Sequence, residues 1–265
     1  MKPFFSIILT TYNRAHIIDQ VINSISKQKY KNFELLIIDD CSTDDTSTII
    51  SNIDDSRIKY FKTRKNSGGP AIPRNIGLLN SKGSWVCFCD SDDLFLPNHL
   101  TLAYNFIAKK KLTNSLISSN AFIDKTLTTK YFKGKSVNQH KRISLYSNYL
   151  SNKAILSTLF VSNSNVILFN EDTRYVAIED YMFILSNMKA GKKHYYLSEP
   201  TIFYNPSSPD SVRLANDKEW KILISKWKMF TNSTLCTLIS MYLLIKLVAK
   251  SIYLKLSITN RIIKQ

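Results

Sequence analysis

The chain of 265 residues is 44% hydrophobic and 21% charged, with only 6 glycines and 7 prolines. This composition excludes collagen-like, disordered and mini-protein classes and suits one large folded domain or slightly more. The net charge of +16 is uneven, because residues 1–100 carry 12 bases and 11 acids whereas residues 181–265 carry 13 bases and 4 acids. A nearly neutral N-terminal part and a basic C-terminal part argue against a single basic groove that follows a nucleic acid. We therefore expect no nucleic-acid partner.

The cysteines and the first residues predict a cytoplasmic location. The four cysteines, at positions 41, 87, 89 and 236, form no CxxC pair, which is typical of reduced thiols in the cytosol. The first apolar run, residues 4–9, is too short for a signal peptide.

The first hundred residues alternate apolar runs with helical patterns, which predicts βαβ units and a mainly parallel sheet. Buried strands are expected over residues 4–9, 33–38, 58–61 and 85–89. Helices are expected over residues 17–25, 43–52 and 72–81, and after Pro97. Ser42 is the expected cap of the second helix.

Later elements are less regular. Residues 116–133 predict a pair of strands, and residues 166–169 predict another strand. A helix over residues 181–190 should end at Gly191, whereas the polar stretch 134–164 gives no clear pattern.

Three expected strands end in polar or acidic residues: Thr10 to Asn13, Asp39-Asp40, and Asp90-Ser91-Asp92-Asp93. Ligands of open α/β sheets bind beyond the carboxyl ends of the strands, so we expect the site there. The chain has neither GxGxxG after its first strand nor GxxxxGK[ST], which leaves a bound cation as the usual way to neutralise phosphate. The Asp90 to Asp93 carboxylates suit Mg²⁺ or Mn²⁺ rather than zinc, although a solvated turn before a helix would look similar.

Other side chains could complete a nucleotide site. Asp39 and Asp40 end a strand where doubly wound folds place a carboxylate on a ribose or base, unless they only open a turn. Arg74 could reach carboxylate or phosphate, or be a structural arginine. Tyr12 offers a ring on which a base can stack, or it only packs.

Glu179 and Asp180 form a second carboxylate pair at the start of an expected helix. A helix start holds a carboxylate rigidly enough to act as a general base. Acidic residues are also common there for the helix dipole alone.

Taken together, these motifs resemble glycosyltransferase family 2, the inverting enzymes of the GT-A fold that make bacterial surface polysaccharides. The resemblance runs in family order through residues 6–14, 34–44, 66–77, 83–93 and 179–180, and covers about residues 3–206. It implies an α/β fold with a mainly parallel, Rossmann-like sheet flanked by helices.

The resemblance also implies roles for the matching residues. It makes Asp180 the catalytic base and Asp92 the metal ligand, with Mg²⁺ or Mn²⁺ as cofactor, and Asp93 and Glu179 as possible supporting residues. It implies that the donor-binding residues are Thr10, Tyr12, Asp39, Asp40, Arg74 and Asp90. The expected reaction moves one sugar from a nucleotide-sugar donor to a glycan or lipid-linked acceptor in lipopolysaccharide, capsule or O-antigen synthesis.

Two departures narrow this expectation. The QxxRW motif of processive members is absent, which favours addition of one sugar per encounter. Tyr204 is followed by Asn205 where the family often has arginine, so donor and acceptor contacts there stay open. Asp40 favours a pyrimidine donor, most simply a uridine one.

We expect a catalytic domain over residues 1–216, with a nucleotide-binding half at 1–110 and an acceptor-binding half at 111–216, followed by a basic helical tail at 217–265. Residues 235–245 are too short an apolar run to span a membrane. A basic amphipathic helix within residues 231–265 could lie on an anionic membrane, or could pack on the domain with its lysines solvated.

Two other functions remain open. A sugar-phosphate nucleotidyltransferase shares nucleotide, metal and sheet, but usually has a glycine-rich turn where this chain has Thr10 to Arg14. A non-catalytic basic membrane-binding module explains the basic rear and leaves the acidic strand ends unexplained.

Overall fold

A computed structural model of the chain describes residues 2–123, 128–130, 141–150, 152, 154–205 and 245. Internal contacts divide the chain into two units, Met1–Val212 and Arg213–Gln265. The expected membrane-binding tail at 231–265 lies outside the described residues except for Ile245, and both it and the division at residue 216 stay predictions. Within the described ranges, no helix is long and apolar enough to cross a bilayer.

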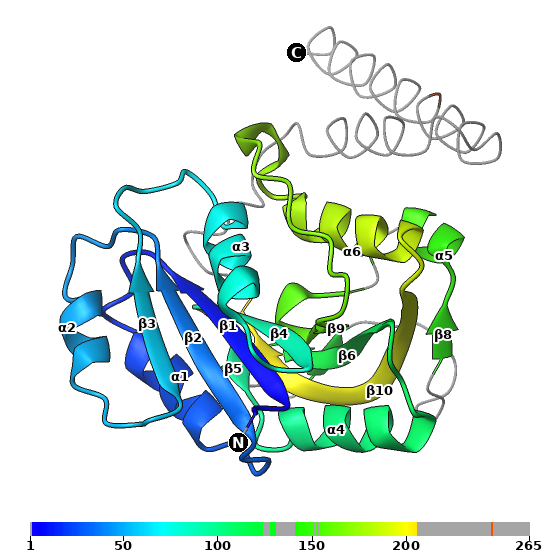
Figure 1. Cartoon of the computed structure of the whole chain (residues 1–265), viewed down its shortest axis with the longest axis horizontal. Coiled ribbons are helices and arrows are strands. Elements are labelled where there is room, and N and C mark those ends of the chain that lie inside the picture. The colour runs from blue at the N-terminus through cyan, green and yellow to red at the C-terminus, as the bar shows by residue number, and fades with distance from the viewer. Residues whose placement is uncertain are drawn as a thin grey trace, which may run out of the picture. The chain divides into compact units, whose positions relative to one another are not determined.

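Ten described strands form one mixed sheet whose centre follows the order β3-β2-β1-β4-β9-β6-β10-β5 (Figure 1). The strands of the N-terminal half are β1 (Phe5–Thr11), β2 (Phe33–Asp39), β3 (Ile58–Lys62), β4 (Trp85–Asp90) and β5 (Leu94–Phe95). Those that follow are β6 (Ser115–Ile123), β7 (Thr128–Lys130), β8 (Lys141–Ile143), β9 (Phe160–Ser162) and β10 (Lys193–Tyr204). β3, β2, β1 and β4 are all parallel, and β6 is parallel to β10.

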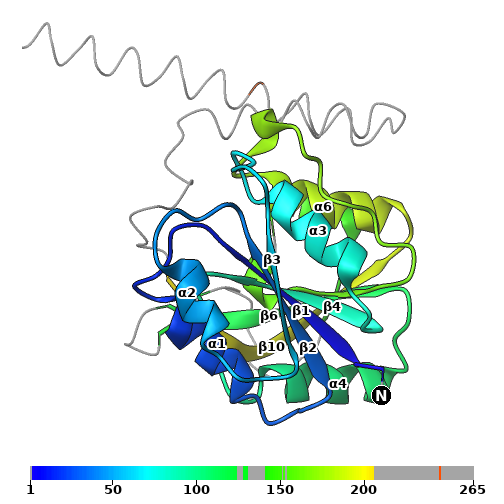
Figure 2. The same ribbon diagram turned by 60° about the vertical axis from the view of Figure 1, so that its left-hand side comes forward.

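Helices cover both faces of this sheet (Figure 2). They are α1 (Ile18–Ser26), α2 (Thr46–Ser51), α3 (Ala71–Asn80), α4 (His99–Lys110), α5 (Leu145–Leu150) and α6 (Glu179–Lys189), with 3₁₀ turns η1 (Leu156–Thr158) and η2 (Thr173–Tyr175). α1 and α4 pack into one hydrophobic cluster, and α3 and α6 into another on the opposite face.

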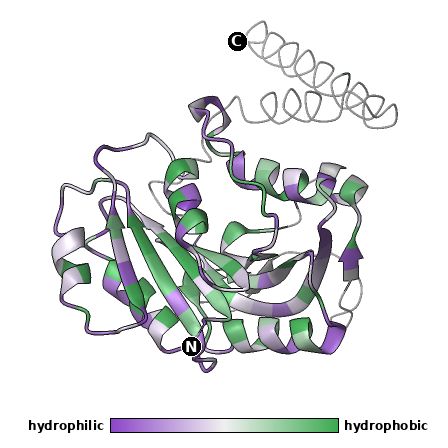
Figure 3. Ribbon diagram, in the orientation of Figure 1, coloured by the Kyte–Doolittle hydropathy of each residue, from purple (hydrophilic) through white to green (hydrophobic). Residues whose placement is uncertain are grey.

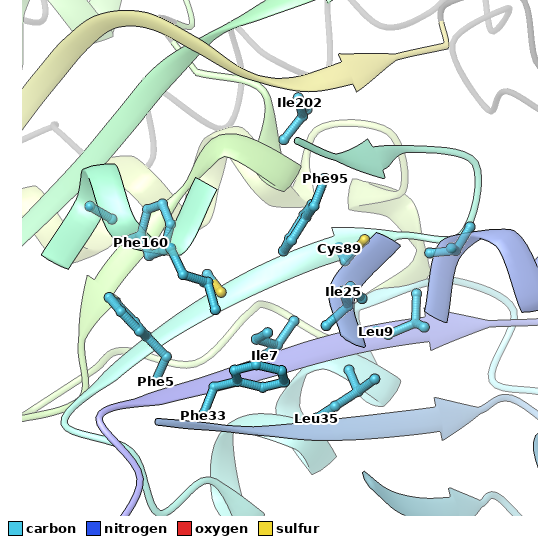
Figure 4. Close-up of a cluster of buried hydrophobic side chains, with 14 of the residues drawn as sticks. Phe5, Ile7, Leu9, Ile25, Phe33, Leu35, Cys89, Phe95, Phe160 and Ile202 are labelled. Carbon is cyan, nitrogen blue, oxygen red and sulfur yellow. The ribbon is translucent and has the colours of Figure 1, made fainter. Parts of the chain in front are cut away.

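The alternation of side chains along β1 feeds both clusters. Phe5, Ile7 and Leu9 point to the face of α1, whereas Ile8 points to the face of α3, and all four are fully buried. Figure 4 shows Ile7 and Leu9 beside Ile25 of α1. A strand buried on both faces reads as a continuous apolar run, which is why the central strands are hydrophobic along most of their length (Figure 3).

α3 lies unusually close to β1. A Cβ added to Gly77 would lie 2.5 Å from Cγ2 of Ile8, so only glycine permits this approach. The contact fixes α3 over the centre of the sheet, with its first turn beside the carboxyl ends of β1 and β4. α3 is therefore placed to present side chains to the expected site.

The expected α/β fold and its mostly parallel sheet are confirmed. The four strands expected in the first hundred residues are β1 to β4, and the helices between them occur within a few residues of their expected bounds. The expected strand pair at 116–133 is β6 and β7, which pair antiparallel; residues 124–127 and 131–133 lie outside the described residues. Gly191, with φ of +99°, follows α6 as expected.

Two local predictions are wrong. Residues 166–169 form no strand, because side chains take the place of a neighbouring strand: Asn187 bonds to both the N–H and the carbonyl of Ile167, and Asn75 does the same for Phe169. The strand of this region is β9 instead. Ser42 does not cap α2, because its hydroxyl accepts from the backbone N–H of Asn13 on the neighbouring loop.

Candidate active site

The carboxyl ends of β1, β2 and β4 lie side by side. Thr10 of β1 is in register with Ile38 of β2 on one side and with Asp90 of β4 on the other. Thr11 is in register with Asp39. The parallel order therefore brings the polar strand ends to one edge of the sheet, as expected.

Hydrogen bonds tie the loop after β1 to the loop after β2. The N–H of Asn13 donates to the Ser42 hydroxyl at 2.9 Å, and the Asn13 side-chain oxygen accepts from the N–H of Thr43 at 2.8 Å. Tyr12 lies in this fastened loop with 43% of its surface exposed. The loop therefore holds an open aromatic ring in a fixed place.

Asp40 is buried and organises the loop that follows β3. Its carboxylate accepts from the Thr63 hydroxyl at 3.1 Å, and from both the N–H and the hydroxyl of Ser67, at 3.0 and 2.8 Å. These donors are all neutral, so none of these bonds brings a basic side chain to the carboxylate. Its position beside Thr10 and Tyr12 follows from the register of β1 and β2.

Asp39 is fully buried, and the protein itself uses both of its carboxylate oxygens. One accepts from the N–H of Ser42 at 2.8 Å, and the other from the Tyr60 hydroxyl at 2.6 Å. Burial and the Asp39 carboxylate raise the pKa of Tyr60 above its usual value. Asp39 therefore fixes the turn that carries Cys41, whose φ of +67° is left-handed.

Arg74 joins the two carboxylate groups that lie far apart in the sequence. Its Nη1 donates to Oε1 of Glu179 and its Nη2 donates to Oδ1 of Asp90, each at 2.8 Å. The side chain is 6% exposed. Burial opposes the charged guanidinium, but Asp90 and Glu179 outweigh it, and the pKa of Arg74 lies above its usual value.

This arginine places the start of α6 beside the end of β4. Asp180, the next residue after Glu179, is half-buried, and its Oδ1 accepts from the N–H of Tyr181 at 2.6 Å. Ala177, two residues before α6, has a left-handed φ of +74°, a strained conformation for a residue with a Cβ. The structure thus brings the Asp90 to Asp93 turn and the Glu179-Asp180 pair into one region.

Asp93 is the buried carboxylate of the Asp90 to Asp93 turn. It is fully buried, its Oδ1 accepts from the N–H of Asn205 at 3.2 Å, and no described group donates to its Oδ2. Burial, together with the charges of Asp90 and Asp92, raises the pKa of Asp93 well above its usual range. The carboxylates of this turn that are not fully buried are those of Asp90 and Asp92.

These carboxylates fit one way of binding a divalent cation. Mg²⁺ typically takes one or two protein carboxylates and completes its shell with water and phosphate oxygens. Asp92 is half-buried, and Asp90 has 33% of its side chain exposed, so both are open to solvent. In the described part of the chain, no three histidine, cysteine or acidic side chains could enclose an ion, which excludes only a closed cage there.

Several residues that build the site were not predicted to take part in it. Ser67 and Thr63 donate hydrogen bonds to the Asp40 carboxylate. The Ser157 hydroxyl accepts from the backbone N–H of Asp90 at 3.0 Å, and the N–H of Asn205 donates to Asp93. Asn75 follows Arg74 and donates to the Glu171 carboxylate at 2.8 Å. Only Ser67, Asn75 and Asn205 lie in or beside motifs that could have drawn attention to them.

The sequence profile of Glycosyl transferase family 2 matches residues 6–167, more than half of the chain. The chain belongs to glycosyltransferase family 2. An uncharacterized glycosyltransferase of Haemophilus influenzae is 33% identical to this glycosyltransferase over 220 residues, which are 80% of each chain. A Campylobacter jejuni GalNAc(5)-diNAcBac-PP-undecaprenol beta-1,3-glucosyltransferase is 34% identical over 145 residues, 54% of this chain and 46% of that enzyme.

Solved structures confirm the GT-A fold of this glycosyltransferase. TarS 1–349 of Staphylococcus aureus in complex with UDP-GlcNAc is 26% identical, with a TM-score of 0.65, and the match covers 84% of this chain and 66% of that one. The mannosyltransferase PcManGT of Pyrobaculum calidifontis, at 16% identity and a TM-score of 0.59, covers 88% of this chain and 64% of its own, and shares the fold. The chain spans 35% of the curated TarS sequence, a poly(ribitol-phosphate) beta-N-acetylglucosaminyltransferase.

Proposed function

We propose that this glycosyltransferase moves one sugar from a UDP-sugar to a lipid-linked or polysaccharide acceptor, with inversion at the anomeric carbon. The observation that carries the proposal is the Arg74 bridge between Asp90 and Glu179. The bridge holds the turn with Asp90 and Asp92, which suits a metal-bound diphosphate, next to the Glu179-Asp180 pair, which suits removal of a proton.

The nucleoside would bind over the ends of β1 and β2. Tyr12 is exposed for stacking on the base, Thr10 lies beside it, and Asp40 would accept from the base edge. Asp39 would act indirectly, because both of its oxygens are already used to hold the adjacent turn. The UDP and UDP-GlcNAc complexes of TarS, at 26% identity, support a uridine donor.

Asp92, with Asp90 toward the ribose or sugar, would hold a Mg²⁺ or Mn²⁺ ion together with the diphosphate. Such an ion, when bound, supplies Lewis-acid stabilisation of the charge that develops on the leaving diphosphate. Arg74 faces the same diphosphate in our assignment, although its guanidinium already serves two carboxylates. Its main role is then to fix the distance between the two acidic groups.

Asp180 would be the catalytic base. It takes the proton of the acceptor hydroxyl while that oxygen attacks the anomeric carbon from the face opposite the diphosphate. The bond between the anomeric carbon and the phosphate oxygen breaks, and its electron pair leaves with UDP. One displacement inverts the configuration, and Glu179 supports the base through its bond to Arg74.

The acceptor belongs to a bacterial surface glycan in this proposal, such as lipopolysaccharide, capsule or O-antigen. The Campylobacter relative and the WfgD relative of Escherichia coli, by their names, act on undecaprenol-linked sugars. An acceptor of that kind lies at a membrane, which suits a peripheral position on the cytoplasmic face of the inner membrane through residues 231–265.

The test is to incubate the protein with a panel of sugar nucleotides and Mn²⁺ and to measure the products. We expect free UDP from one UDP-sugar. Release of pyrophosphate from UTP in the presence of a sugar phosphate would instead identify a nucleotidyltransferase. The absence of turnover together with binding to vesicles would identify a membrane-binding module. Either result would contradict the proposal.

A further inference from the structure

The loop before α3 touches the segment that precedes α6, far along the chain. A Cβ added to Gly69 of this loop would lie 2.8 Å from Cγ2 of Val176, closer than Cβ atoms approach other carbons in proteins. Both residues line one small pocket together with Glu179. Gly69 does not have a positive φ, so the close approach of Val176, and not the turn itself, requires a residue without a side chain.

The loop that carries Gly69 is anchored at both of its ends. Before Gly69, the N–H and the hydroxyl of Ser67 donate to the Asp40 carboxylate at 3.0 and 2.8 Å. After Gly69, the carbonyl of Pro70 accepts from the N–H of Arg74 in the first turn of α3. The loop is therefore a fixed surface for Val176 to pack against.

The segment that carries Val176 is tied to α6. Val176 and Ile178 each donate a backbone hydrogen bond to the carbonyl three residues earlier, and the carbonyl of Ile178 accepts from the N–H of Met182 in α6. Because these bonds run along the chain and into the helix, the segment and the start of α6 should move together. Ala177 has a left-handed φ of +74°, and such strain persists only where the surroundings fix the backbone. The packing of Val176 on Gly69 supplies a constraint of that kind.

We propose that Gly69 and Val176 are positioning residues for the base of the reaction. The proposal rests on the proposed transferase function, in which Asp180 takes the proton of the acceptor. Val176 packs against the anchored loop, and this contact sets where α6 begins and so where Asp180 lies. The ion pair of Arg74 with Glu179 holds the same helix start, which is thus fixed at two points.

One short loop then serves both halves of the reaction. Ser67 holds Asp40, where the nucleobase would bind, and Gly69 follows it by two residues. The separation between the bound nucleotide and Asp180 depends on this loop, so a change at Gly69 should affect turnover more than nucleotide affinity.

The experiment is a double-mutant cycle of Gly69→Ala and Val176→Ala in the full chain. It measures kcat for UDP release from the UDP-sugar that the panel identifies, and UDP affinity by calorimetry. The methyl group of Gly69→Ala has to displace Val176 by about 0.6 Å, from 2.8 Å to an ordinary contact of 3.4 Å. We expect this shift to lower kcat about tenfold, while UDP affinity changes by less than about twofold.

The second substitution should restore the rate. With alanine at both positions, the added Cβ lies 4.0 Å from the Cβ of residue 176, which is an ordinary contact. We expect kcat of the double variant to lie within about threefold of wild type. Val166→Ala is the matched control, because it shortens another partly buried valine of the chain before α6 and should not rescue Gly69→Ala.

Three results would overturn the proposal. They are equal kcat in all four proteins of the cycle, a double variant as slow as Gly69→Ala, and rescue by Val166→Ala as well as by Val176→Ala. A fall in UDP affinity as large as the fall in kcat would also overturn it, because the loop would then act on the nucleotide and not on the base.

Failure of this proposal can be told apart from failure of the proposed function. Ile178 is 1% exposed and directly precedes Glu179, so its methyl signals in NMR report the start of α6 without any turnover. We expect these signals to shift in Gly69→Ala and to return in the double variant; unshifted signals would contradict the proposal. A protein that releases UDP but shows no rescue refutes only the positioning role, whereas a protein that releases no UDP refutes the function.

Discussion

The carboxylates at the end of β2 and those around Arg74 are satisfied in different ways. Asp39 and Asp40 accept several hydrogen bonds from neutral hydroxyl and backbone groups. Asp93 and Glu179 each keep a buried oxygen to which no described group donates. In the first region, hydrogen bonds within the protein hold the carboxylates in place and support a surface on which a base could stack. In the second region, where the reaction would take place, some buried carboxylate oxygens accept no hydrogen bond from a described group.

The largest expected effect lies in the reaction region. Asp180→Asn removes the proton acceptor and should lower kcat by about 10³-fold while UDP affinity stays nearly unchanged, since a base acts mainly in the transition state. Steady-state kinetics and calorimetry measure the two quantities. Near-normal turnover would remove Asp180 from the role of base.

Arg74→Gln tests whether the arginine holds the two acidic groups together. Removing the cation leaves Glu179 and Asp90 without their charged partner and should lower the free energy of unfolding by about 3 kcal/mol. Urea denaturation measures this loss, and adding Glu179→Gln should restore part of it. Arg174→Gln is the control, because that arginine is largely exposed and its removal should leave the denaturation midpoint unchanged.

Asp39→Asn tests the scaffold at the other region. The amide cannot accept from both the Ser42 N–H and the Tyr60 hydroxyl as the carboxylate does, so we expect a loss of about 1–3 kcal/mol in stability. UDP affinity should fall in parallel, because the turn beside Asp40 loosens. An unchanged denaturation midpoint would show that these hydrogen bonds contribute nothing.

A buried histidine should make the whole fold sensitive to acid. His194 of β10 is fully buried between Ser118 and Asn148, and Asn148 accepts through its carbonyl from the Tyr181 hydroxyl of α6. Burial lowers the pKa of His194 to about 3. Below about pH 6.5 this histidine binds a proton in the unfolded chain but stays neutral in the folded chain. The free energy of unfolding therefore decreases as the pH is lowered from 7.

From this histidine alone, the loss between pH 7 and pH 5 should be about 2 kcal/mol. Urea denaturation of wild type and His194→Gln at both pH values isolates it, because the shifted His99 remains in both proteins. A variant with the same acid loss as wild type would show that His194 does not carry the effect.

The fold could be predicted from local pattern because β1 to β4 are apolar on both faces and end in polar residues. The position of candidate site residues was predictable only where acidic residues follow strand ends, as at Asp40, Asp90 and Asp92; their roles stay predictions. The hydrogen bonds from the side chains of Asn75 and Asn187 to the backbone of residues 166–169 could not be predicted. The apolar sequence there looks the same whether its backbone pairs with a strand or with side chains. The Arg74 to Glu179 bond, across 105 residues, depends on how α6 packs on α3 and has no local signal.

The most direct test of the whole account is calorimetry of UDP binding, with and without Mn²⁺, to the wild-type protein and to Asp92→Asn. The account predicts that Mn²⁺ strengthens UDP binding to wild type by at least about tenfold and that Asp92→Asn loses this dependence while it keeps the fold. Metal-dependent UDP binding that is the same in both proteins would contradict it, because the acidic turn after β4 would then not be where the nucleotide diphosphate and its cation meet.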